Sequence, residues 1–292
     1  VYYYFKHEQD KHEMVLGLSS GYPQCEESSV PFPRTTGTRR HGLITSWEHQ
    51  YEFVSGKWEH TDYNFTEQPY TSPTNLLKNA PKHPDIKIQG INKYEVYDAP
   101  GNFMSPRDSQ HDADLRQEEK EVPHDVVRAA SECKTFTAGH KFTLSDHYGA
   151  DGEKKAYLIT SIEHAASQPG PETGDTSQPA KYSNRFNCIP ASVQFRPARL
   201  TPKPLVSGIN TAVVVGPDGE EIFTDKYGRV KVAFHWDRVA QKDDKKKKEG
   251  EECCCWIRVA QGIAGKKWGF MAIPRIGQEV VVDFVEGDPD RP

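Results

Sequence analysis

The stretch that decides the fold is residues 222–292, which reads IFTDKYGRVKVAFHWDR, then a lysine-rich interruption, then CCCWIRVAQGIAGKKWGFMAIPRIGQEVVVDFVEGDPDRP. In residues 230–236 apolar side chains recur at every second position, which is the period of a half-buried β-strand. Residues 255–259 and 278–285 repeat this alternation. We therefore predict three strands, with the following residues on the buried faces: Val230, Val232, Phe234, Trp236, Cys255, Ile257, Val259, Val280, Val282 and Phe284.

Turn residues separate these strands. Residues 225–228, 262–265, 274–277 and 287–289 are rich in glycine, proline and aspartate. Such residues supply a positive φ or hold φ near about −65°, as tight turns require. Short strands at this spacing are typical of a small antiparallel barrel.

The same segments resemble the OB-fold of the VgrG family, the trimeric spikes of bacterial type VI secretion systems. VgrG proteins are similar to the fused hub and spike proteins of contractile phage tails. The matching segments follow one another in order at 225–232, 234–237, 255–259, 268–269 and 273–292. The structural motif positions that the resemblance implies are Asp225, Tyr227, Gly228, Arg229, Phe234, Trp236, Asp237, Trp256, Arg258, Trp268, Gly269, Pro274, Arg275, Gly277, Gln278, Glu279, Asp283, Glu286, Gly287, Asp288 and Pro289.

The resemblance extends over the whole chain and implies a mainly β fold with minor α. It implies a phage-hub-like domain of the two-barrel type at residues 1–197, with its N-terminal part missing, and an OB-fold barrel at 198–292. A last barrel strand and a triple-stranded β-helix needle would follow residue 292. The proline-rich residues 196–204 read as a stiff linker between the two domains.

A structural function follows from the resemblance. The chain is expected to be a homotrimer that adapts the hexameric Hcp tube to a trimeric needle, without being an enzyme. A PAAR-repeat tip protein and effectors would bind through the needle. The protein would reside in the bacterial cytoplasm before firing and be exported without a signal peptide, to the outside or into a target cell.

Composition limits the other function classes. The 292 residues predict about two domains, and 22 glycines with 21 prolines favour strands and turns over a helical bundle. The formal net charge of −5 gives no overall basic field that would recruit nucleic acid or anionic lipid. No run approaches the roughly 20 apolar residues that span a bilayer, so we expect no stable membrane insertion.

The N-terminal two thirds of the chain also predict mostly strands. Residues 2–7 and 13–18 predict a hairpin, and residues 43–56, 57–65, 95–98, 157–164 and 186–195 predict further strands. Residues 112–121 carry strong helix formers and end before Pro123, so they predict a helix. Residues 124–131 are expected to add a further turn of helix.

Several motifs imitate catalytic or metal sites. Ser19 lies in a G-x-S-x-G pattern, but a proline-dotted segment follows where the helix of a nucleophile elbow is needed, so a turn is favoured. His12 and Glu13 begin an H-E-x-x-H pattern that fails at Leu16. Residues 260–267 also fail as a phosphate-binding loop, because Lys267 stands where serine or threonine belongs.

Histidines and cysteines give no convincing ligand set. His140, His147 and His164 are predicted to be hydrogen-bonded or solvent-facing. The six cysteines, Cys25, Cys133, Cys188 and the run 253–255, have the spacing neither of a disulfide scaffold nor of a zinc site. We therefore predict no catalytic, cofactor-binding or metal site.

Two alternatives remain open. The lysines from Lys245 to Lys248, with nearby Trp236, Trp256 and Trp268, fit an OB-fold that binds nucleic acid. Acidic residues flank these lysines, which favours a solvated loop instead. The second alternative is the non-catalytic scaffold of a spike tipped with an enzyme.

Overall fold

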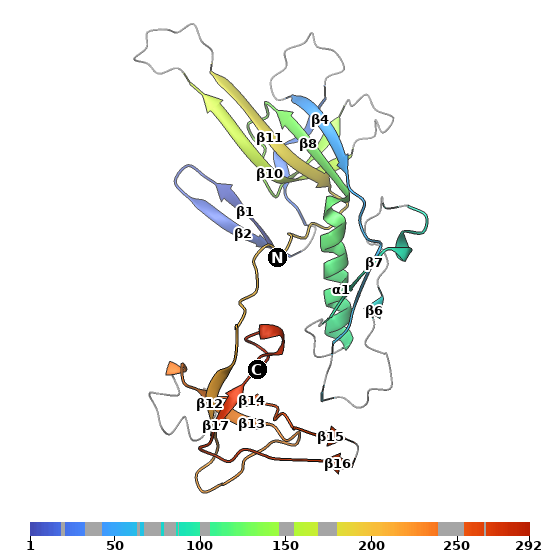
Figure 1. The fold of residues 1–292 in the computed structure, drawn as a ribbon. Coiled ribbons are helices and arrows are strands. Elements are labelled where there is room, and N and C mark those ends of the chain that lie inside the picture. The colour runs from blue at the N-terminus through green and yellow to red at the C-terminus, as the bar shows by residue number, and fades with distance from the viewer. Residues whose placement is uncertain are drawn as a thin grey trace. The chain divides into compact units, whose positions relative to one another are not determined.

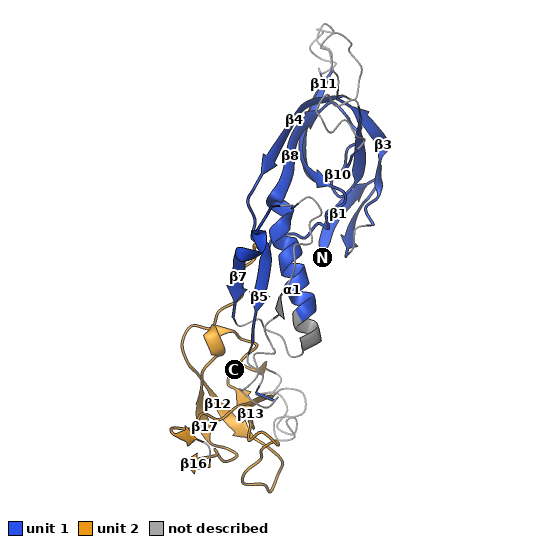
Figure 2. Ribbon diagram, turned by 90° about the vertical axis from the view of Figure 1, so that its right-hand side faces the viewer, with its two compact units in different colours: residues 1–198 blue, residues 199–292 orange. Residues whose placement is uncertain are grey.

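The protein is described here from a computed structural model, which covers residues 1–18, 21–32, 43–62, 65–66, 77–78, 86, 88–99, 106–145, 155–168, 180–238, 254–265 and 267–292. The chain divides into two compact units, Val1–Ala198 and Arg199–Pro292 (Figure 2). Strands predominate among the described residues, which contain a single α-helix. This composition confirms the mainly β fold class.

The first unit is built on a six-stranded sheet with the strand order β3-β9-β10-β11-β8-β4 (Figure 1). Its neighbouring strands are antiparallel, except that β3 pairs with β9 in parallel. The sheet curls around its own core (Figure 2). The strands are β3 (Gln24–Pro31), β4 (Ile44–Tyr51), β8 (Asp125–Ser131), β9 (Lys141–Ser145), β10 (Ala156–Ser167) and β11 (Lys181–Pro190).

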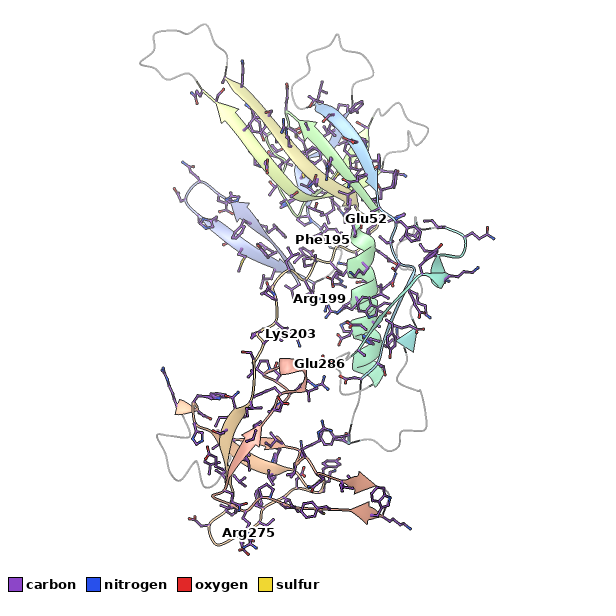
Figure 3. The ribbon with its side chains drawn as sticks, viewed as in Figure 1. Glu52, Phe195, Arg199, Lys203, Arg275 and Glu286 are labelled. Atoms are coloured by element: carbon purple, nitrogen blue, oxygen red, sulfur yellow. The ribbon has the colours of Figure 1, made fainter. Side chains whose placement is uncertain are left out.

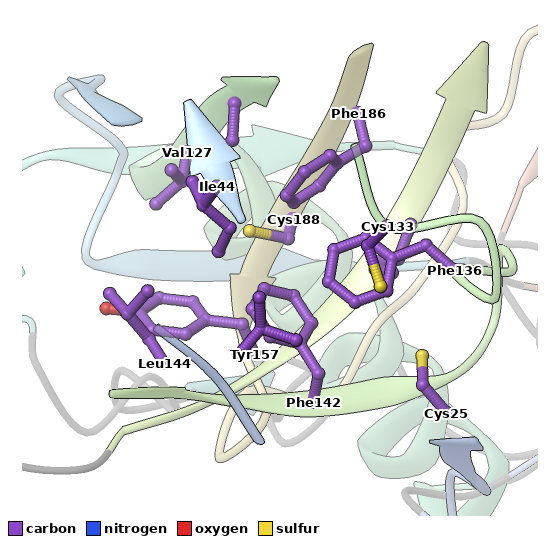
Figure 4. Packing of buried hydrophobic residues seen from close by; sticks show 13 residues of the cluster. Cys25, Ile44, Val127, Cys133, Phe136, Phe142, Leu144, Tyr157, Phe186 and Cys188 are labelled. Carbon is purple, nitrogen blue, oxygen red and sulfur yellow. The ribbon is translucent and has the colours of Figure 1, made fainter. Parts of the chain in front are cut away.

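Aromatic rings fill the concave side of this sheet (Figure 4). The Phe136 and Phe142 ring centroids lie 4.7 Å apart, and the Phe186 centroid lies 5.2 Å from that of Phe136 and 5.8 Å from that of Phe142. The edge-to-face contacts of Phe186 are a preferred geometry for aromatic pairs. Trp47 closes the cluster with its ring 4.9 Å from Tyr157.

The helical prediction for residues 124–131 was wrong. Residues 122–124 form the short 3₁₀ helix η2 (Val122–His124), and Asp125–Ser131 is strand β8, which lies between β11 and the edge strand β4. Its side chains alternate between buried and more exposed positions, so Val127 and Ala129 enter the core while Arg128 faces outward. Pairing on both sides, with β11 and β4, stabilises the extended conformation.

The sequence also failed to predict β3, because proline and polar residues dominate residues 21–33. Cys25 and Val30 are nevertheless buried in the core. The backbone pairs with β9 at Ser29, Val30 and Pro31, after an irregularity that separates these pairs from Gln24. Pro31 stands at the end of an edge strand, a position that tolerates proline.

A second sheet of three strands, β6-β5-β7, lies beside helix α1 in the first unit (Figure 1). Its elements are β5 (Lys57–His60), β6 (Leu77–Lys78), η1 (Ile91–Lys93) and β7 (Glu95–Asp98), and the helix is α1 (Pro106–Glu121).

Helix α1 begins six residues earlier than predicted. Proline suits the first position of a helix, because the N–H group that proline lacks would have no partner within the helix there. The buried residues of α1 are Ala113, Gln117 and Glu121. Gln117 Nε2 donates hydrogen bonds to Glu121 Oε1 at 2.7 Å and to the Ser55 carbonyl at 3.1 Å.

The second unit contains a four-stranded sheet with the order β14-β13-β12-β17 and a small hairpin, β15-β16 (Figure 1). The elements are β12 (Asn210–Val215), β13 (Val230–Phe234), β14 (Cys255–Ile257), β15 (Ala264–Gly265), β16 (Trp268–Gly269), β17 (Glu279–Val282) and η4 (Val285–Gly287). The core of this unit contains Ala212, Val214, Val230, Val232, Phe234, Ile257, Val282 and Phe284. The alternation predicted for the three strands is confirmed at those of its positions that this core contains.

Two details of the second unit correct the predicted pattern. Strand β13 ends at Phe234, where the Asp237 N–H donates to the Phe234 carbonyl and turns the chain. Trp236 therefore lies outside the core and stacks on Phe234. Ala233, on the face expected to be solvated, is buried with Val215.

Candidate interaction surfaces

Two tyrosines attach the hairpin of β1 (Tyr2–His7) and β2 (His12–Gly17) to the rest of the first unit. Tyr2 and Tyr4 are buried in a cluster with Leu158 and Ile189. Gly139 has a φ of +78°, and a Cβ atom added there would lie 2.6 Å from Cγ of Tyr4. Because Gly139 has no side chain, the Tyr4 ring can pack against its backbone.

The opposite face of this hairpin is exposed and apolar. It carries Tyr3 and Phe5 from β1, paired across the hairpin with Leu16 and Met14 from β2. The rings of His7 and His12 continue this face at the tip, 6.1 Å apart. A solvated face of an antiparallel sheet is normally polar, so this surface is a candidate for contact with another polypeptide.

The buried thiols lack the features of catalytic nucleophiles. Burial, followed by a hydrogen bond donated to Glu27, raises the pKa of Cys133 to about 12. Burial also raises the pKa of Cys25 and of Cys188. A thiol with a raised pKa stays protonated near neutral pH, and the thiolate is the reactive form.

Two of the histidines that could have suggested a metal site, His140 and His164, have hydrogen-bond partners. His140 Nδ1 lies 3.2 Å from the Ala138 carbonyl, and His164 Nδ1 lies 2.6 Å from the Tyr182 hydroxyl. The described residues contain no group of three or more His, Cys, Asp or Glu that could hold a metal ion. Ser19, His147, the lysines from Lys245 to Lys248 and Cys253 lie outside the described residues. Among the helices that are described, none has the length and apolar character needed to cross a bilayer.

The first group of motif positions forms a tight turn around Asp225. Its Oδ1 accepts the N–H groups of Tyr227 and Arg229, each at 2.9 Å, and its Oδ2 accepts Arg229 Nε at 2.7 Å. Gly228 adopts the positive φ of +73° that this turn needs. Desolvation acts to raise the pKa of Asp225, but the hydrogen bonds from Arg229 and Tyr227 outweigh it and hold the pKa below its usual value.

We expect the Asp225 turn to make the second unit less stable in acid. Because the folded-state pKa is lowered, the stabilisation is present above the unfolded pKa of about 3.9 and is lost as pH falls through the folded pKa. Asp225→Asn keeps an acceptor but removes this titration. Urea unfolding of both proteins at neutral pH and at pH 3 should show a smaller pH dependence in the variant, and equal dependences would contradict the prediction.

A second group of motif positions shapes the turn before β17. Arg275 Nη1 forms an ion pair with Glu221, and the backbone N–H of Arg275 donates to Gln278 Oε1 at 2.8 Å (Figure 3 labels Arg275). Gly277 has a φ of +87°, and its N–H donates to the Val214 carbonyl at 2.8 Å. The turn is thereby tied to β12. Pro274 precedes this turn, and Glu279, the first residue of β17, lies 3.3 Å from His235.

The last motif residues form the turn at η4. Glu286 and Gly287 have φ values of +55° and +70°, and the Gly287 carbonyl accepts the Val206 N–H at 2.8 Å. Asp288 accepts the Asp290 N–H at 3.0 Å and lies 3.2 Å from Lys203 Nζ. The hydrogen bond from Asp290 is the main cause of the lowered pKa of Asp288. Pro289 follows within the same turn, and the Asp283 carboxylate accepts the Phe284 N–H.

The tryptophan positions differ in their surroundings. Trp256 is half-buried, with its ring 5.3 Å from that of Phe223 and 5.3 Å from Lys231 Nζ. Trp268 is 68% exposed and covers Gly265, where an added Cβ would lie 2.3 Å from the indole. Gly269, the residue after Trp268, has a φ of +133°. The side chain of Arg258 is exposed. Trp268 lies outside the core of the second unit, because its hairpin turns the ring outward.

Trp268→Ala is therefore expected to lower the free energy of unfolding by less than about 1 kcal/mol, as is usual for exposed side chains. Phe284→Ala is the contrasting variant, because its buried ring should cost about 3 kcal/mol or more. Denaturant unfolding monitored by circular dichroism would compare the two. Equal losses would contradict the assignment of Trp268 to the surface.

Comparison with known families supports the fold and identifies it. Residues 1–170 match the phage tail baseplate hub (GPD) family, and residues 223–292 match the type VI secretion system/phage-baseplate injector OB domain. The whole chain is 40% identical over 295 residues to the type VI secretion system spike protein VgrG1b of Pseudomonas aeruginosa. This chain belongs to the VgrG family.

Other VgrG relatives agree with this assignment. VgrG1a of Pseudomonas aeruginosa is also 40% identical over the whole chain, and the Vibrio cholerae protein named actin cross-linking toxin VgrG1 is 33% identical over 99% of it. The chain spans 38%, 44% and 25% of the lengths of VgrG1b, VgrG1a and the Vibrio protein. It thus corresponds to a part of each of these longer VgrG proteins.

Solved structures show the same fold at low sequence identity. An E. coli component of the type VI secretion system, described as similar to the T4 tail proteins gp27 and gp5, superposes with a TM-score of 0.52, covering 99% of this chain and 54% of its own at 16% identity. A chain of the half-lidded Francisella PdpA-VgrG complex gives a TM-score of 0.51, covering 96% of this chain and 47% of its own at 9% identity.

Proposed function

We propose that this chain is the hub and collar region of a type VI secretion spike, acting as a rigid, non-catalytic part of the injection machine. The observation that carries the proposal is the 40% identity to named spike proteins along the entire chain. The buried, protonated thiols also favour a structural function.

In this proposal residues 1–197 form a hub of the two-barrel type and residues 198–292 form an OB-fold collar. The motif positions act by fixing turns of the collar, as the hydrogen bonds of Asp225, Gln278 and Asp288 support. The hub docks on the hexameric Hcp tube, and the collar continues into a needle that carries a PAAR-repeat tip and effectors. Export follows the route of the machine itself, from the bacterial cytoplasm to the outside or into a target cell.

The function requires three copies of the chain around one axis. We expect the purified protein to be a homotrimer held by interfaces of obligate size, upward of about 2,000 Å² each. Light scattering coupled to size exclusion at micromolar concentration should give three times the 33.0 kDa mass of one chain. A stable monomer or dimer would contradict the spike function of this region.

A further inference from the structure

The outward face of the six-stranded sheet carries one charged side chain on each of four neighbouring strands. Arg128 of β8 lies directly opposite Glu48 of β4. Arg185 of β11 lies directly opposite Glu163 of β10. All four side chains are exposed. Because the strand order is β10-β11-β8-β4, the charges run negative, positive, positive, negative across the sheet (Figure 1).

The two arginines are diagonal neighbours on adjacent strands. Arg128 is paired with Asn187 of β11, whereas Arg185, two residues earlier on β11, is paired with Ala130. Diagonal neighbours in an antiparallel pair lie about 7–8 Å apart, a distance that long side chains can span. The two guanidinium groups can therefore reach one ligand together.

A hollow of about 590 Å³ lies over this part of the sheet. The residues that line it include the four charged ones and the short side chains of Ser46, Ala130 and Ser161. Asn187 Nδ2 donates a hydrogen bond to Ser161 Oγ at 3.1 Å, which fixes one side of the floor. Short side chains between long charged ones leave room for another polypeptide to approach the sheet.

Neither arginine of the hollow has a partner among the described residues. Although each lies directly opposite a glutamate, no ion pair or hydrogen bond joins either guanidinium group to a described residue. Arginines elsewhere in the described chain do pair with a carboxylate, as these four show: Arg116, Arg196, Arg229 and Arg275. The guanidinium groups of Arg128 and Arg185 therefore keep their N–H donors for a ligand.

The charge pattern selects the class of ligand. A guanidinium group binds a carboxylate through two parallel hydrogen bonds, so two neighbouring arginines fit two carboxylates. Glu48 and Glu163 flank the arginines and repel a uniformly anionic ligand, such as nucleic acid or an anionic lipid surface. The formal net charge of −5 gives the chain no general attraction for anions either.

We propose that this face binds a segment of another protein, with two carboxylates over Arg128 and Arg185 and a basic residue on each side of them. In an extended chain, alternate side chains point the same way and lie about 6.4–6.8 Å apart, close to the spacing of the two arginines. The complementary segment thus carries its charges in the order positive, negative, negative, positive at alternate positions. This binding surface goes beyond the proposed spike function and does not depend on it.

Two peptides of equal composition and net charge test the inference. Lys-Ser-Glu-Ser-Glu-Ser-Lys has the complementary order of charges, and Glu-Ser-Lys-Ser-Lys-Ser-Glu has the reverse order. Titrations followed by saturation-transfer difference NMR would give their dissociation constants, because this method detects weak ligands of a large protein. The first peptide should bind more tightly. Arg128→Gln/Arg185→Gln should weaken its binding about 2- to 30-fold, the effect of losing two surface ion pairs.

Arg238→Gln is the matched control, because Arg238 is also exposed but lies in the second unit. This variant should bind both peptides as the unmodified chain does. Reversal of all four charges, in Glu48→Lys/Arg128→Glu/Glu163→Lys/Arg185→Glu, keeps the net charge and should exchange the preference between the two peptides. Near-ultraviolet circular dichroism would confirm that each variant remains folded.

Equal affinities for the two peptides, or a preference that the charge reversal leaves unchanged, would overturn the inference. Binding of an oligonucleotide or an anionic vesicle through Arg128 and Arg185, in place of the peptide, would also overturn it. Loss of the trimer in Arg128→Gln/Arg185→Gln would show instead that a second copy occupies this face. These outcomes leave the proposed function intact, because that function is tested by the mass of the unmodified chain in solution.

Discussion

Phe142→Ala is expected to lower the free energy of unfolding of the first unit by about 3–5 kcal/mol, the usual cost of truncating a buried phenylalanine. Phe142 is fully buried and its ring contacts those of Phe136, Phe186 and Tyr157. The six-stranded sheet curls around this cluster, so the cavity that the alanine would leave cannot collapse unless several strands move. Denaturant unfolding followed by tryptophan fluorescence would measure the loss, because Trp47 lies against the same cluster.

Phe53→Ala is the matched control for this prediction. It removes the same side chain from the same unit, but Phe53 is exposed and its ring meets that of Tyr94 at the surface. We expect a change of less than about 1 kcal/mol. If the two variants lost similar stability, the cluster around Phe142 would not be the core of the unit.

Gly139→Ala is expected to destabilise the first unit by about 2–5 kcal/mol, the sum of two costs, and to loosen the hairpin β1–β2. An alanine at a positive φ costs about 1–2 kcal/mol, and an overlap with a packed side chain adds about 1–3 kcal/mol. The new Cβ would lie 2.6 Å from Cγ of the buried Tyr4, which therefore has to move. Hydrogen exchange should show faster opening of β1 in the variant.

Gly90→Ala separates the two costs, because Gly90 has the same φ of +78° but no atom closer than 3.9 Å to an added Cβ. The free energy of unfolding that Gly90→Ala loses should therefore be the cost of the backbone conformation alone. The double variant Tyr4→Ala/Gly139→Ala should lose less stability than the sum of its single changes, because Tyr4→Ala removes the overlapping ring. Equal losses at Gly90 and Gly139, with additive changes in the double variant, would exclude the proposed overlap.

The local sequence pattern was sufficient to predict a strand where that strand has one buried face. The alternation of Val230, Val232 and Phe234 predicted β13, and residues 2–7 predicted β1, because a period of two places every second side chain on the same side. The motif segments in 222–292 also indicated the family correctly. These signals lie within short stretches of chain and need no knowledge of distant residues.

Strand β8 shows where local pattern fails. Residues 125–131 contain two alanines and an arginine, which favour a helix, yet they lie between β11 and β4. Pairing with strands about fifty and eighty residues away in the sequence outweighs a small intrinsic preference. No local signal could have supplied those neighbours, and the same applies to β3.

The fold class and the positions of most strands and turns could be predicted from the sequence, because they depend on periodicity and on turn residues that are close together in the chain. The family could be recognised because its motif segments are local as well. Which of the large aromatic residues are buried could be seen only in the folded protein. Trp268 and Tyr3 are large aromatic residues like Phe142, but their hairpins turn them outward while the curled sheet encloses Phe142. Burial depends on what packs against a residue from elsewhere in the chain, so the exposed face of β1–β2 became visible only in the folded molecule.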